Sequence, residues 1–119
     1  MKLHVKTKTW IENDNHDLLF GKGKTDLLEL IEEEGSIAGA AQRLSMNYKK
    51  AWTHIKILRK HFADELVLSK KGGSGAGGTT LTPTARSLIK NYRTLQDDIE
   101  SYANHRFREL FDPDSQKPL

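Results

Sequence analysis

The sequence predicts a mainly helical α+β fold in which two β-hairpins alternate with four helices, the last of them long. Three patterns carry this prediction. Apolar residues recur every three or four positions in the helical segments, they alternate with polar residues at the N-terminus, and a glycine-rich run at 70–78 joins two short β-like stretches. A chain of 119 residues suits a single domain, which we expect to span residues 1–111 ahead of a flexible tail at 112–119.

The composition is typical of a soluble protein. It has 36% hydrophobic and 29% charged residues, and no apolar run approaches the roughly 18 residues that a membrane span needs. The sequence contains no cysteine and no recognisable secretion signal, so we expect a cytoplasmic location.

The first 20 residues show the alternation of a β-hairpin. Residues 2–12 place apolar and threonine side chains on one side and mainly basic ones on the other, which predicts a strand. A turn-forming cluster follows at 13–16, and residues 17–20 are expected to return as a second strand.

The segment 24–34 predicts the first helix. Leu27, Leu30 and Ile31 share one face, and Gly35 is a natural stop. We expect Thr25 to be the N-cap and Asp26 to lie in the first turn, where a negative charge suits the helix dipole.

Two further helices joined by a tight corner are expected at 37–44 and from the corner to about His61. Ser36 is the expected cap of the first of them, and either Ser45 or Asn47 can cap the second. The small Ala40 and Ala41 allow close helix packing. Apolar residues recur along the inner face of the second helix at Ala51, Ile55, Leu58 and Phe62.

Positive charge is concentrated on this pair of helices. The net charge is −3 over residues 1–34, +6 over 35–71 and 0 over 72–119. The outer face of the second helix of the pair combines cations with hydrogen-bonding side chains, as a helix that faces phosphates and base edges would. The candidate DNA contacts on it are Asn47, Tyr48, Lys49, Lys50, Thr53 and Lys56. Lys56 and Arg59 lie farther along, so they suit phosphate better than bases. A solvated basic face without a ligand is the alternative.

A second hairpin and a long helix complete the predicted elements. Strands are expected at 66–69 and 79–81, with Lys70 and Lys71 in the connecting loop able to reach phosphate or a minor groove. Thr82 and Pro83 suit the start of a helix that runs to about Phe111. Its near-heptad seam predicts a dimer interface of Leu88, Tyr92, Leu95, Ile99 and Tyr102.

This order of elements is that of a winged helix-turn-helix with an N-terminal extension. In that fold the first two helices hold the third by its apolar stripe, so that its N-terminal half can enter a major groove about 12 Å wide. The second hairpin is then the wing.

Two stretches, SIAGAAQRLSMNYKKAW at 36–52 and GGSGAGGTTLT at 72–82, resemble the N-terminal DNA-binding domain of the molybdate-responsive ModE regulators. The resemblance spans about 27–92 and extends more distantly to the helix-turn-helix of LysR-type regulators. It implies a homodimeric transcription factor whose third helix and wing contact an inverted-repeat operator, with the last helix in the dimer interface.

The sequence departs from that family at several positions. Members usually have glycine where this chain has Ser45 and Ala85, arginine near Ser69, and a wing lysine where it has Ser74. Ser74 therefore joins the candidate DNA contacts, and the base preference is expected to differ. The chain offers no match to the family's oxyanion-binding motif, so molybdate sensing is not carried over and any effector stays unknown.

Other signals for a site are weak. Gly73, Gly75 and Gly78 match a GxGxxG pattern, but they precede a β-like stretch instead of opening a helix. The scattered histidines lack metal-ligand spacing, and no nucleophile has a recognisable setting, so we expect no cofactor, metal or enzymatic activity. Trp52 could serve in the core or in dimer packing, or it could contact a thymine methyl group or a sugar of DNA. A protein-interaction module on the same scaffold is the alternative function, and neither the operator nor activation versus repression follows from the sequence.

Overall fold

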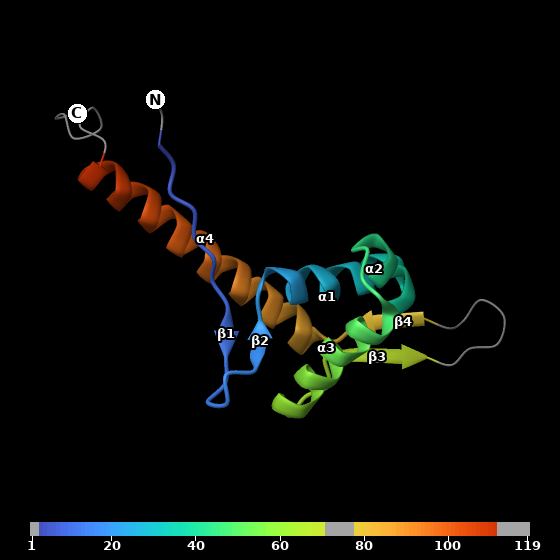
Figure 1. The fold of residues 1–119 in the computed structure, drawn as a ribbon. Coiled ribbons are helices and arrows are strands. Elements are labelled where there is room, and N and C mark those ends of the chain that lie inside the picture. The colour runs from blue at the N-terminus through green and yellow to red at the C-terminus, as the bar shows by residue number, and fades with distance from the viewer. Residues whose placement is uncertain (1–2, 71–77, 112–119) are drawn as a thin grey trace.

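The computed structural model describes residues 3–70 and 78–111, which form eight helices and strands (Figure 1). They are β1 (Ile11–Glu12), β2 (Leu18–Phe20), α1 (Lys22–Glu34), α2 (Ile37–Arg43), α3 (Tyr48–His61), β3 (Val67–Lys70), β4 (Gly78–Leu81) and α4 (Pro83–Phe111). This order confirms the predicted fold class, a mainly helical winged helix-turn-helix. The loop at 71–77 and the expected tail at 112–119 lie outside the described residues.

The N-terminal hairpin is shorter than predicted. β1 and β2 pair antiparallel, with Ile11 opposite Phe20 and an irregularity in register after it. The strand predicted for residues 2–12 is wrong for 3–10, which run as an extended segment alongside α4 (Figure 1). An extended chain lying on a helix buries every second side chain just as a strand does, so both give the same alternation.

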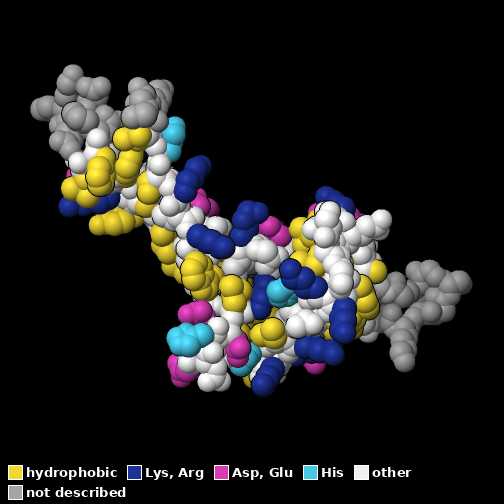
Figure 2. Space-filling view, viewed as in Figure 1, with side chains coloured by type: hydrophobic (Ala, Val, Ile, Leu, Met, Phe, Trp, Pro, Cys, Tyr) yellow, Lys and Arg dark blue, Asp and Glu magenta, His cyan; other side chains and the backbone are white. Residues whose placement is uncertain are grey.

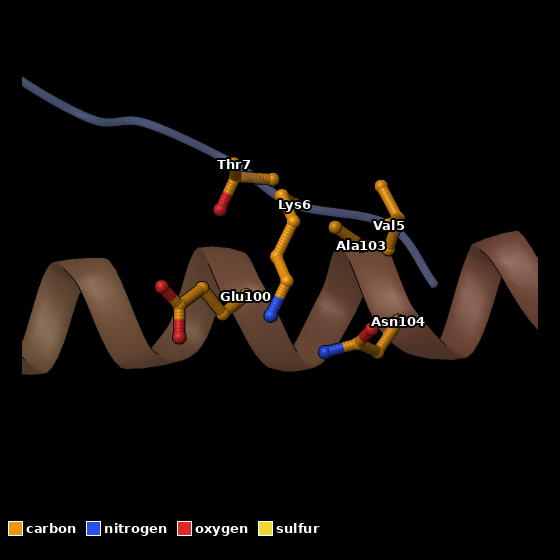
Figure 3. A pocket seen from close by; sticks show the side chains of 6 residues that line it. All are labelled: Val5, Lys6, Thr7, Glu100, Ala103 and Asn104. Carbon is orange, nitrogen blue, oxygen red and sulfur yellow. The ribbon is translucent and has the colours of Figure 1, made fainter. Parts of the chain in front are cut away.

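Contacts between this N-terminal segment and α4 are specific. Val5, Thr7 and Thr9 are half-buried, and the Tyr92 hydroxyl donates a hydrogen bond to the Thr9 carbonyl over 2.8 Å. A small cavity of about 100 Å³ lies between the two, and there the Lys6 side chain extends over α4 between Glu100 and Asn104 (Figure 3). The segment therefore belongs to the folded structure of α4.

The first helix begins earlier than expected. Its N-cap is Gly21, and Thr25 lies inside the helix with its hydroxyl donating to the Gly21 carbonyl over 2.8 Å. The predicted Thr25 cap is therefore wrong, and Asp26 lies beyond the first turn, where it pairs with Lys22 and Arg93. Gly35 ends the helix as predicted, with a φ of 75° that glycine adopts without strain.

The helix-turn-helix is fixed by two local caps. The Ser36 hydroxyl accepts from the Gly39 N–H over 2.9 Å, and the Asn47 side chain accepts from the Lys50 N–H over 3.0 Å. Ser45, the other cap candidate, instead forms the corner with a φ of 52°. The Met46 N–H closes this corner by donating to the Ala41 carbonyl over 2.8 Å. The direction in which α3 leaves the corner is therefore set by backbone and side-chain bonds within residues 36–50.

The core lies under α3 and joins it to the other elements. Ala51, Ile55 and Leu58 are buried as predicted, while Phe62 is half-buried, with its ring edge-on to Phe20 at 5.7 Å. The α1 contribution comes from Leu27, Leu28 and Ile31, whereas the predicted Leu30 is half-buried. α3 is therefore held by its inner face and leaves its outer face to solvent.

The base of the wing is anchored to the helices. β3 and β4 pair in register from Val67 opposite Leu81 to Lys70 opposite Gly78, and the Thr79 N–H donates to the Gly35 carbonyl over 2.8 Å. The Thr82 hydroxyl accepts from the Ala85 N–H over 3.2 Å, which confirms the predicted cap of α4. The wing and the start of α4 are thus fixed relative to α1.

α4 reaches far beyond the core. It spans 29 residues, and the molecule is 65 Å long against 31 and 25 Å in the other directions (Figure 1). Its buried residues, Ala85, Ile89 and Tyr92, all lie in the first half. No helix in the described ranges is both long and apolar enough to cross a membrane.

One residue of the predicted dimer seam belongs to the core. Tyr92 is 2% exposed, and its ring stacks on Phe20 at 6.5 Å, so its side chain is not available to a second copy. Leu88 also packs against the core. Leu95 and Tyr102, at 42% and 67% exposed, and the half-buried Ile99 remain of the predicted seam. The same spacing of four and three serves a core face and an interface face, which is why the sequence did not separate them.

Candidate nucleic-acid interface

The outer face of α3 is the most basic helical surface near the helix-turn-helix. Lys49, Lys56 and Lys60 are exposed on it, Lys50 is exposed at its edge on the His54 side, and none has a carboxylate within salt-bridge distance among the described residues. Lys and Arg side chains are seen on the face that carries α3 in Figure 2. These charges are available to an anionic ligand such as a phosphate backbone.

The acidic side chains of α1 form ion pairs with arginines of α2 and α4. Arg43 binds Glu34 over 2.6 Å, and Arg86 of α4 pairs with Glu32. Arg93 of α4 likewise joins α1 through Asp26 at 2.8 Å and through Glu29. The acidic residues of α1 are therefore paired with arginines of α2 and α4, whereas the exposed lysines of α3 have no carboxylate partner among the described residues.

Two of the predicted DNA contacts also have structural roles. Asn47 caps α3 through its side-chain carbonyl, and the Thr53 hydroxyl donates to the Lys49 carbonyl one turn back over 2.9 Å. Tyr48, Lys49, Lys50 and Lys56 are exposed on the helix as expected. The structure thus gathers Tyr48, Lys49, Thr53 and Lys56 along one groove of α3, whereas Asn47 and Lys50, at the start of the helix, do not line that groove.

Trp52 forms the centre of a side-chain cluster that was not predicted from the sequence. Its indole N–H donates to the Tyr48 hydroxyl oxygen over 2.6 Å, and the Arg59 guanidinium lies 5.6 Å from its ring centre. Trp52 also packs against the core, which is one of the two roles left open for it, and its contact with DNA stays a prediction. The sequence signal for this cluster was its spacing, because Tyr48 lies four residues before Trp52 and Arg59 lies seven residues after it, one and two helical turns away.

These side chains border a shallow groove of about 430 Å³ along α3. The residues that line it are Tyr48, Lys49, Trp52, Thr53, Lys56 and Arg59. Its floor is aromatic and its edges carry the cations. A groove of this kind can take an anionic ligand that also has an apolar group.

His54 lies on the side of α3 that faces α1. Burial, and then the nearby charges of Lys24 and Lys50, lower the pKa of His54, and its Nδ1 is buried without a hydrogen-bond partner in the described structure. Lys24 is itself buried and donates to the Leu18 carbonyl. A neutral His54 is therefore part of the packing beneath the basic face.

The predicted wing contacts lie mostly outside the described residues. Lys71 and Ser74 fall within 71–77, and Lys70 occupies the last position of β3. Their roles stay predictions. The structure does place the base of this hairpin beside the helix-turn-helix through the bond between Thr79 and Gly35.

Comparison with known proteins identifies the same region. The family described as bacterial regulatory helix-turn-helix protein, lysR family, matches residues 25–86, from α1 to the first turn of α4. The chain is 40% identical over 75 residues to the molybdenum transport protein ModE of Azotobacter vinelandii, covering 63% of this chain and 28% of the relative. It is 36% identical over 86 residues to the transcriptional regulator ModE of Haemophilus influenzae, covering 72% and 32%.

A further relative is the molybdenum-pterin-binding protein MopB of Rhodobacter capsulatus, 33% identical over 79 residues, with 66% of this chain and 29% of the relative covered. The chain thus spans less than a third of the length of these relatives. The resemblance inferred from residues 36–52 and 72–82 is confirmed for the helix-turn-helix region.

Proposed function

Because the chain belongs to the lysR family of bacterial regulatory helix-turn-helix proteins, we propose that it is a sequence-specific, double-stranded DNA-binding transcriptional regulator. The observation that carries the proposal is the outer face of α3, where Lys49 and Lys56, without acidic partners in the described structure, line a groove along a firmly capped helix. In this proposal α3 enters the major groove, and its first turns contact the bases.

The proposal assigns the wing to the DNA backbone or the minor groove. Lys70, Lys71 and Ser74 would make these contacts. Its support is the anchoring of β4 to the end of α1, which keeps the hairpin beside α3 at a defined place. Backbone contacts of this kind fix orientation and do not by themselves select a sequence.

The proposal also includes a homodimer that joins through α4. Leu95 and Tyr102 are exposed on one side of the helix, and Leu110 and Phe111 are more than half exposed at its far end. Large apolar side chains repeated along an exposed face of one long helix are typical of a helix-pairing surface. A dimer would present two copies of α3 to two half-sites.

Selection from a random duplex pool, followed by gel-shift measurements at several salt concentrations, tests the function. We expect one enriched sequence, bound at least about 1,000-fold more tightly than unrelated duplex, and a steep loss of affinity as salt increases. The double variant Lys49→Glu with Lys50→Glu should lose this binding, while Lys90→Glu on α4 should retain most of it. Weak binding that is equal for all sequences would contradict the proposal.

The exposed end of α4 also favours a second candidate, a module that binds a partner protein through this scaffold. Tyr102, Leu110 and Phe111 would form its contact surface. The two candidates differ in what the Lys49→Glu with Lys50→Glu variant does. Loss of sequence-specific DNA binding in this variant supports the regulator. Sequence-blind DNA binding in the original chain, with partner binding that survives this variant and is lost in Leu110→Asp with Phe111→Asp, supports the module.

A further inference from the structure

The groove on α3 has an aromatic floor whose polar atoms are mostly in use. Tyr48 is 51% exposed and is the first residue of α3, and Trp52 lies one turn later. The indole N–H, the one polar group of the Trp52 side chain, is already donated to the Tyr48 hydroxyl oxygen over 2.6 Å. The Tyr48 hydroxyl keeps its own O–H donor, and the ring faces of the pair offer carbon surface.

The short polar side chains nearby are partly committed. The Asn47 side-chain oxygen accepts from the Lys50 N–H, and the Thr53 hydroxyl donates to the Lys49 backbone carbonyl. The remaining polar groups of the groove are the long cations Lys49, Lys56 and Arg59 at its edges. Arg59 lies over the Trp52 ring, which leaves the Tyr48 end of the floor for a ligand.

We propose that Tyr48 and Trp52 recognise the C5 methyl group of thymine in the major groove. This inference rests on the proposed DNA-binding function and deepens it by naming a base. The base edges in the major groove offer hydrogen-bond donors, acceptors and one apolar group, and that group is the thymine methyl. An aromatic floor set against any other base edge would leave a donor or acceptor unpaired, which costs free energy.

The position of the pair fits this role. In helix-turn-helix proteins the first turns of the recognition helix contact base edges, and Tyr48 and Trp52 lie in the first two turns of α3. The cations around them suit the phosphates that border a major groove. Trp52 is also the positioning residue, because its hydrogen bond to Tyr48 and its contact with the core hold the Tyr48 ring in place on the surface of α3.

The test replaces each thymine of the selected operator with deoxyuridine, one at a time, which removes the methyl group and nothing else. We expect at least one position in a half-site where this change weakens binding about fourfold, the effect of one buried methyl group. Adding a methyl group elsewhere, by placing 5-methylcytosine at other positions, should not strengthen binding by a similar factor, because the contact is local.

Three variants assign the effect to its residue. Tyr48→Ala should remove the difference between thymine and deoxyuridine, while Tyr48→Phe, which keeps the ring, should retain it. Lys60→Ala, a change at the exposed far end of α3, should leave the ratio of the two affinities unchanged. If Tyr48→Ala binds too weakly in the standard buffer, the ratio is measured at lower salt, where phosphate contacts strengthen both complexes equally.

The outcomes separate this inference from the function on which it rests. Sequence-specific binding in which no thymine is sensitive to deoxyuridine overturns the inference and leaves the regulator in place. A sensitive thymine whose effect persists in Tyr48→Ala assigns the methyl contact to another residue and also overturns it. Failure to enrich any duplex contradicts the proposed function itself.

Discussion

Ser45 holds the corner between α2 and α3 with a φ of 52°, in the left-handed region that costs any residue with a Cβ about 1–2 kcal/mol. Glycine removes that cost, although it loses more backbone entropy on folding. We therefore expect Ser45→Gly to raise the free energy of unfolding by about 0.5–1 kcal/mol in urea denaturation.

A neighbouring serine provides the matched comparison. Ser36 caps α2 at an ordinary extended backbone conformation, so Ser36→Gly should lower stability by a few tenths of a kcal/mol. A loss of stability in Ser45→Gly of the same size as in Ser36→Gly would show that the corner is not strained.

Single residues also show where sequence reasoning reaches its limit. Asn47 was predictable as the cap of α3, because that role needs only its type and its place before the helix, while its contact with DNA stays a prediction. The cluster of Trp52 with Tyr48 and Arg59 was not predicted, because the spacing of the three residues does not determine which rotamers their side chains adopt together. The left-handed corner at Ser45 was hidden because serine at this position signals a cap.

At the scale of the element, α3 depends on an uncharged His54. Its pKa lies below the ordinary 6.5 because of burial and the charges of Lys24 and Lys50. The unfolded chain therefore takes up this proton at a higher pH than the folded one does. This contribution is fully present above 6.5, and stability is lost as the pH falls from there to the folded-state pKa.

Replacing His54 should flatten this pH dependence. We expect His54→Gln to lose less stability than the original chain between pH 7 and pH 5, measured by the urea midpoint at each pH. His105→Gln, on the exposed part of α4, is the matched control and should follow the original curve. Parallel curves for all three proteins would rule out His54 as the source.

Elements with local signals were predicted well, and elements that depend on distant contacts were not. Ser36, Gly35 and Thr82 act through bonds within a few residues, so the ends of α1, α2 and α4 could be placed from the sequence. The segment 3–10 read as a strand because its partner, α4, lies more than 80 residues away. The start of α1 was misplaced because Thr25 resembles a cap, whereas Gly21 gives no side-chain signal.

At the scale of the whole molecule, α4 is the feature that a monomer does not explain. Leu95 and Tyr102 are separated by two turns and are both exposed. We expect Leu95→Asp with Tyr102→Asp to give a folded monomer in analytical ultracentrifugation. Operator affinity should fall roughly 100-fold or more, because two linked half-site contacts become one.

The helix offers a control with the same spacing and the same added charge. Thr94 and Ser101 are exposed on another side of α4, so Thr94→Asp with Ser101→Asp should leave the dimer intact. Circular dichroism should show unchanged helix content in both double variants. A dimer that survives the change at Leu95 and Tyr102 would place the interface elsewhere.

The length of α4 has a mechanical consequence. A helix of 29 residues is about 44 Å long, and Arg86 and Arg93 clamp its first half to α1. In the proposed dimer, α4 connects the contact with the partner to the helix-turn-helix that contacts DNA. A swing of about 10° would move that helix-turn-helix by roughly 7 Å, close to two base-pair steps. The stiffness of α4 with the packed segment 3–10 would then fix the spacing between half-sites that the dimer can bind. A small bend of α4 would be enough to move the two helix-turn-helix units away from that spacing.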